Sequence, residues 1–230
     1  MPNLSRLAAL IGWLGVAVFL GTAVVTAVAY TGSAGEPYSP LNHYVSELGE
    51  RKNSELSVVF NSGVAIGGIC LAVLLVEVGR RIGGGRGLAV SVLGALAGVS
   101  GTFVGFIPMD EKASHLLVSG SFFLALAAAV GLATLWMGGK AFPRRAAAWW
   151  LGLLTVAASV AFFILNRVEG PGLGGAADPN APRPAIALDS VIEWAALLGV
   201  LGWVTVASAT IWRAERPLGV ALRPVSGESR

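Results

Sequence analysis

The chain has 230 residues, of which 55% are hydrophobic and only 13% are charged, and its mean hydropathy is +0.73. Soluble domains carry about 25% charged residues, so this composition excludes a water-soluble globular protein. The net charge of +3 comes from basic residues spread over several short segments, which argues against a nucleic-acid partner.

Six apolar runs follow one another along the chain, each close to the roughly 20 residues that a helix needs to cross a bilayer core of about 30 Å. Lipid offers the backbone no hydrogen-bond partners, and the runs are rich in Ala, Leu and Gly and lack alternation, so helices are favoured over strands. We therefore predict an all-α integral membrane six-helix bundle. It forms a single transmembrane domain over residues 1–230, with spans at about 7–30, 55–78, 87–108, 113–137, 146–166 and 189–212.

The first run is longer than the apolar core of a secretory signal peptide, about 7–15 residues, so we predict an uncleaved span. Charge then predicts the orientation. Eleven of the 16 Lys and Arg residues lie at the two termini or in the second-to-third and fourth-to-fifth loops. The positive-inside rule places this side, with both termini, in the cytoplasm. We expect the protein to be integral to the plasma membrane of the cell.

The first external loop contains the polar stretch YSPLNHYVSELGE, residues 38–50. Ser39 followed by Pro40 is typical of a helix start, and Gly49 of a helix stop. The apolar residues between them follow a helical i, i+3, i+4, i+7 spacing, at Leu41, Tyr44, Val45 and Leu48. We predict a short amphipathic helix over 40–48 that lies in the outer interface, with its polar face toward water or over the bundle mouth.

Glycines of the third span recur at helical spacing, at Gly94, Gly98, Gly101 and Gly105. Such a stripe allows close helix contact, so we expect the third span to lie centrally, against the second or the sixth. The glycine run in RRIGGGRG predicts a tight turn between the second and third spans.

Further polar groups are predicted at the same depth as the first loop. The third-to-fourth turn, IPMDEKASH, carries Asp110 and His115, and the sixth span begins LDSVIEW, with Asp189 and Glu193. Ionisable groups inside a span are costly and are functional candidates by default. The candidate ligand-binding residues are Ser39, His43, Ser46, Glu47, Asp110, His115 and Glu193.

Each of these residues also has a purely structural interpretation. Glu193 with Ser190 fits a capping box, Asp110 can cap the fourth span, and His43 can pair with Glu47 on a solvated surface. His115 can serve structural hydrogen bonding.

A metal site is disfavoured because the chain has only two His residues and no H-x-x-x-H or H-E-x-x-H helix, and we expect no cofactor. A Ser-His-acid hydrolase built on Ser39 or Ser46 lacks a supporting G-x-S-x-G motif.

Three motifs resemble a known family. The first is Tyr38-Ser39 with Val45-Ser46-Glu47-Leu48-Gly49, the second is Ile107-Pro108-x-Asp110 followed by His115, and the third is Glu193-Trp194. They resemble motifs of the domain-of-unknown-function family 998. His43 matches no recurrent position of that family, and Ile107 stands where Phe is more usual. The resemblance covers nearly the whole chain and implies a six-helix prokaryotic membrane protein with no settled activity.

Our leading hypothesis is a membrane protein that binds a lipid head group or small amphiphile in an outward-facing polar pocket roofed by the helix 40–48. Membrane lipids are then its partners, and the sequence does not identify any protein partner. The alternative is an intramembrane lipid hydrolase or transferase that uses His115 with Asp110 or Glu193. Coupled transport is a third possibility, disfavoured because no repeat and no ionisable residue at a span centre is present.

Overall fold

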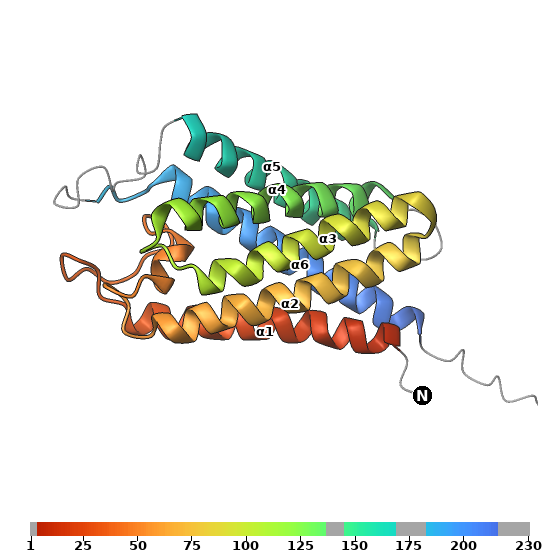
Figure 1. Cartoon of the computed structure of the whole chain (residues 1–230), viewed down its shortest axis with the longest axis horizontal. Coiled ribbons are helices and arrows are strands. Elements are labelled where there is room, and N and C mark those ends of the chain that lie inside the picture. The colour runs from red at the N-terminus through yellow and green to blue at the C-terminus, as the bar shows by residue number, and fades with distance from the viewer. Residues whose placement is uncertain (1–3, 137–144, 169–182, 216–230) are drawn as a thin grey trace, which may run out of the picture.

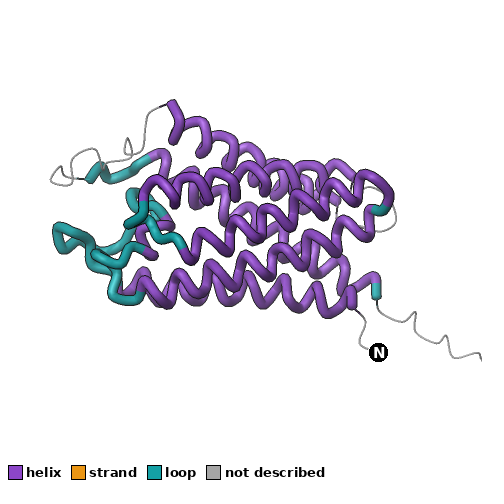
Figure 2. Tube along the Cα trace, viewed as in Figure 1, coloured by secondary structure: helices purple, strands orange, loops and turns teal. Residues whose placement is uncertain are grey.

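The structure is a computed structural model that describes residues 4–136, 145–168 and 183–215. Within these ranges the chain forms six long helices and one short 3-10 helix (Figures 1 and 2). Their bounds are α1 Leu4–Ala29, η1 Val45–Gly49, α2 Ser57–Ile82, α3 Gly84–Phe106, α4 Lys112–Trp136, α5 Arg145–Val168 and α6 Leu188–Ala214. All six long helices are long and apolar enough to cross a membrane, so the predicted six-span all-α fold is confirmed.

The helices form a closed ring in chain order, because each packs against the next and α6 returns to pack against α1. The N-terminal end of α1 and the C-terminal end of α6 lie together, at what we call the terminal end (right in Figure 1). The opposite, first-loop end carries residues 30–56, the turn 107–111 and the start of α6 (Figure 2). Large apolar side chains cover the outside of the ring, including Val28, Val58 and Trp150, as expected for helices that face lipid.

Glycines bring α2 and α3 into close contact. A Cβ atom added at Gly98 would lie 2.6 Å from the carbonyl oxygen of Gly68 on α2, so no larger residue fits without moving a backbone. Gly94 and Gly105 also face α2, whereas Gly101 faces Phe122 of α4. The predicted packing of the third span against the second is confirmed, but its central position is wrong, because α3 lies in the ring between α2 and α4.

The turn between α2 and α3 is as tight as predicted. Gly83 and Gly84 have φ values of +74° and +59°, a region that favours glycine. At the same end of the bundle, the buried carboxylate of Glu77 accepts hydrogen bonds from Arg81 (3.0 Å) and from the hydroxyl of Ser5 (2.6 Å). Arg81 also pairs with Glu215, so α1, α2 and the end of α6 are held together there.

Candidate functional site

The first loop enters the bundle instead of lying on its surface. Val45 and Leu48 are buried and pack with Phe19 of α1 and Phe60 of α2. The predicted amphipathic helix over 40–48 is not confirmed, because residues 40–42 form a turn, Tyr44 is extended and only Val45–Gly49 is helical, as the 3-10 helix η1. The loop adopts this shape because partners elsewhere in the chain bind its backbone N–H groups.

Two carboxylates of α6 hold the loop. Oε2 of Glu193 accepts a hydrogen bond from the N–H of Val45 at 2.7 Å, and Asp189 accepts one from the hydroxyl of Tyr44. The two acids are four residues apart and therefore lie on one face of α6. Glu193 does not close a capping box with Ser190, because α6 has Ala187 as its N-cap residue.

Glu47 of η1 forms the centre of an ion-paired cluster. Arg183 donates to both of its oxygens, from Nη1 at 3.1 Å and from Nη2 at 2.8 Å. The N–H of Tyr44 and the hydroxyl of Tyr30 donate to the same carboxylate. Burial and the nearby charge of Glu47 raise the pKa of the Tyr30 phenol above its usual value. Glu47 is thus a structural anchor that joins η1 to the segment before α6.

His43 is buried between two aromatic rings and not paired with Glu47 on a solvated surface. Its ring centroid lies 5.4 Å from that of Tyr30 and 5.3 Å from that of Tyr38. Nε2 is 3.7 Å from Glu36, beyond hydrogen-bond distance. Burial disfavours the charged imidazolium and lowers the pKa of His43 below its usual value, an effect that Arg183 reinforces.

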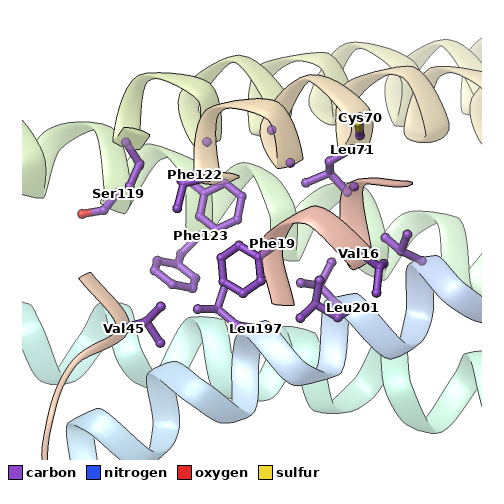
Figure 3. A pocket seen from close by; sticks show the side chains of 18 of the residues that line it. Val16, Phe19, Val45, Cys70, Leu71, Ser119, Phe122, Phe123, Leu197 and Leu201 are labelled. Carbon is purple, nitrogen blue, oxygen red and sulfur yellow. The ribbon is translucent and has the colours of Figure 1, made fainter. Parts of the chain in front are cut away.

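A cavity of about 110 Å³ lies inside the ring, directly beneath η1. Its wall is mostly apolar and is shown in part in Figure 3, where Phe19, Phe122, Phe123 and Leu197 surround the space. Three polar candidates line its first-loop end: Ser46 of η1, His115 of α4 and Glu193 of α6. The cavity therefore combines a polar roof with an apolar interior.

His115 presents a defined face to this cavity. Its Nδ1 lies 2.7 Å from the carbonyl oxygen of Ile107, and because a carbonyl only accepts, Nδ1 must carry the proton. In the neutral ring Nε2 is then a hydrogen-bond acceptor. Asp110 lies apart from the cavity lining: its carboxylate accepts the backbone N–H of Arg51 at 2.9 Å and so joins the turn 107–111 to the first loop.

The predicted site residues thus divide into three groups. Ser46, His115 and Glu193 line the cavity, and His43 and Glu47 belong to the buried network of the first loop. Ser39 and Asp110 hold local backbone, the former through its hydroxyl, which accepts the N–H of Leu41 at 3.3 Å.

Sequence reasoning missed Arg183, which belongs to no recognisable motif, and it also missed the aromatic lining of the cavity. Among residues 4–136, 145–168 and 183–215, no group of three or more His, Cys, Asp or Glu side chains is placed to hold a metal ion.

A second hollow lies on the lipid-facing side of the bundle, between α1 and α6 near the first-loop end. It has a volume of about 680 Å³ and is lined by apolar residues together with Tyr38 and Trp194. The indole N–H of Trp194 donates to the hydroxyl of Tyr38 at 3.0 Å. Consecutive residues of α6 line the two spaces, Leu197 the cavity and Leu198 the hollow, so one thin wall separates them.

Six apolar spans closed by an inserted loop define a multi-pass integral membrane protein. The family model "Protein of unknown function (DUF998)" matches residues 14–210, and the chain belongs to this family, as its motifs predicted. No curated protein and no solved structure matches the chain.

Proposed function

We propose that the protein binds one single-chain amphiphile, with its apolar chain in the cavity and its head group beside Ser46, His115 and Glu193. The observation that carries this proposal is the division of the cavity wall, with polar groups beneath η1 and apolar side chains below them. Ligand sites are mostly apolar, with a few polar groups that fix orientation, and this cavity has that composition.

The depth of the cavity matches a single chain, and because a twelve-carbon chain occupies more than the cavity's volume of about 110 Å³, the lining side chains must move apart to admit it. Along α6 its lining runs from Glu193 to Val204, which is 11 steps along the helix, or roughly 16 Å at 1.5 Å per residue. This is about half of a 30 Å hydrocarbon core, so the cavity has the depth of one leaflet. With the termini in the cytoplasm, as the charge pattern predicts, that leaflet is the outer one.

The hollow between α1 and α6 supports access from the lipid side. It opens toward lipid at the level of the first loop, and its wall is shared with the cavity. We infer that an amphiphile reaches the cavity by a small separation of α1 and α6, where Leu197 and Leu198 form the wall.

Binding is favoured over the hydrolase or transferase alternative. A histidine base is oriented by a third group, and for His115 that group is the carbonyl of Ile107 and not Asp110 or Glu193, the acids that this alternative pairs with it. Within the described residues, the hydrogen bonds of Asp110 and Glu193 go to backbone N–H groups of the first loop.

A photoreactive dodecanol with a diazirine at its chain end tests the proposal in protein reconstituted in lipid nanodiscs. After irradiation, the labelled residues are mapped by peptide mass spectrometry. We expect adducts on cavity residues such as Phe19 and Leu201, and excess unlabelled dodecanol should remove them. Adducts confined to lipid-facing residues away from both spaces, such as Val58 and Val92, would contradict the proposal.

Gly67 offers a matched pair of variants for the same experiment. It lines the cavity, and an added Cβ would find its nearest neighbour at 3.8 Å, so a larger side chain has room only by occupying the cavity. Gly21 lies on the exposed face of α1, where an added Cβ meets nothing within 4 Å. Gly67→Leu should remove the cavity adducts, and Gly21→Leu should leave them unchanged.

A further inference from the structure

Glu193 is a buried carboxylate without a cationic partner among the described residues. Only 6% of it is exposed, and its recorded partner is the neutral N–H of Val45. The neighbouring Asp189 is likewise bonded to neutral groups, the Tyr44 hydroxyl and the N–H of Ser190. Buried charges are ordinarily paired, so without a cation beside it the buried Glu193 stays in its neutral, protonated form, and a bound cation would allow it to ionise.

The remaining lining of the cavity fits a cation as well. It contains no Lys or Arg, so it offers no permanent positive charge to an anionic head. Four phenylalanines line the cavity, namely Phe19, Phe60, Phe122 and Phe123. Aromatic faces attract cations, most strongly where water is excluded. Phe19 and Phe60 also pack in one cluster with Val45, whose N–H binds Glu193, so aromatic rings and carboxylate belong to the same region.

We propose that the amphiphile bound in this cavity carries a cationic head group, an alkylammonium that Glu193 pairs with and the phenylalanines surround. This inference rests on the proposed function and narrows its ligand class. An anionic head of the same chain length would add an unpaired charge beside the buried acid, and a hydroxyl head would leave Glu193 neutral, so only a cationic head gains from its ionisation.

The experiment compares three competitors of equal chain length against the photoreactive dodecanol: dodecyltrimethylammonium, dodecanol and dodecanoate. The trimethylammonium head is used because its charge does not depend on pH. In nanodiscs of zwitterionic lipid, we expect the ammonium to displace the probe from the cavity at about a tenfold lower concentration than dodecanol, and dodecanoate to be the weakest.

Glu193→Gln keeps an acceptor for the N–H of Val45 and removes the charge, so it should abolish the preference for the ammonium while dodecanol still competes. Glu111→Gln, at an exposed acid of the same end of the bundle, should retain the preference. If Glu193→Gln fails to fold, Phe122→Leu provides an independent answer, because weaker cation–aromatic attraction should reduce the preference several-fold.

The outcomes separate the two proposals. Equal competition by dodecanol and the ammonium, or an unchanged preference in a folded Glu193→Gln or Phe122→Leu variant, would overturn the cationic ligand and leave amphiphile binding intact. If none of the three compounds displaces the probe, amphiphile binding itself fails.

Discussion

The carboxylate of Glu193 and the backbone N–H of Val45 are joined by a 2.7 Å hydrogen bond across 148 positions of the sequence. Both residues line the cavity, so this bond fixes the roof to the wall. The loop is thereby held as part of the bundle interior, and its position depends on side chains of α6.

Removing this acceptor should loosen the roof. We predict that Glu193→Ala speeds amide hydrogen exchange in residues 44–49, because a buried N–H left without a partner costs about 1–3 kcal/mol, equivalent to roughly tenfold or more in local opening. Glu193→Gln should retain most of the protection. Exchange mass spectrometry measures both, with a peptide from the middle of α2 as internal control. Equal exchange in the Ala variant and the wild type would contradict the anchoring role.

The ion pair between Glu47 and Arg183 should contribute strongly to stability. Arg183→Gln leaves the buried Glu47 without its cation, and removal of one partner of a buried pair costs roughly 3–5 kcal/mol. We expect the low end of that range, because the Arg183 side chain retains 23% exposure. Unfolding in mild detergent measures the change.

Arg51→Gln is the control for this ion pair. Arg51 is an exposed cation of the same loop, so its replacement should change the free energy of unfolding by less than about 0.5 kcal/mol. A similar loss in both variants would point to a general charge effect and not to the specific pair.

His43 should make the protein less stable in mild acid. Burial lowers the pKa of His43 in the folded state, so below the unfolded value of 6.5 the unfolded chain binds a proton that the folded chain resists. The contribution of the neutral His43 ring to the free energy of unfolding is therefore fully present above pH 6.5, and it decreases as the pH falls below 6.5.

The contribution of His43 is isolated by comparison with His43→Gln, which keeps polarity and does not titrate. We expect the melting temperature of the wild type to fall more between pH 7.5 and pH 5.5 than that of the variant. Because both proteins share every other titratable group, parallel pH profiles would exclude His43 as the source of acid sensitivity.

The contact between α2 and α3 provides a prediction about packing. Gly98→Ala would place a methyl group against the backbone of Gly68, and overpacking of this kind typically costs about 1–3 kcal/mol. Gly21→Ala, on the open face of α1, should be neutral or slightly stabilising, because alanine favours a helix. Thermal unfolding of the two variants should therefore differ in direction, and equal stabilities would mean that α2 and α3 are not in close contact.

The six spans were predictable because lipid imposes a length and an apolar composition on each helix independently of the others. The observed bounds of α2, Ser57–Ile82, for example, differ from the predicted 55–78 only at the ends. The shape of the first loop was not predictable in this way. Of the four residues predicted to share one apolar face, Tyr44, Val45 and Leu48 are buried, whereas Leu41 is exposed. The conformation of the loop depends on Glu193 and other distant partners.

The candidate site was predictable only in part for the same reason. Ser46, His115 and Glu193 were recognisable as polar groups at one depth, and they line one cavity. Asp110 was also predicted at that depth as a polar group, yet its carboxylate binds the backbone of the first loop and does not line the cavity. Arg183 gave no signal, because the sequence contains no local pattern that links it to Glu47, 136 positions away.

Cys70 allows the central proposal to be tested without a new label site. It is the single cysteine of the chain, it is buried, and it lines the cavity (Figure 3). A small membrane-permeant methanethiosulfonate reagent therefore reports whether the cavity is free. The matched control is Val92→Cys in a Cys70→Ala background, because Val92 is 59% exposed on the lipid-facing side of α3, away from the cavity and the hollow.

The most direct measurement is the rate of Cys70 modification with and without dodecyltrimethylammonium in the nanodisc. If the cavity binds the amphiphile, the ligand slows modification of Cys70 in a saturable manner and leaves the rate at Val92→Cys unchanged. An unchanged rate at Cys70 across the ligand titration, or equal slowing at both positions, would contradict amphiphile binding in the cavity.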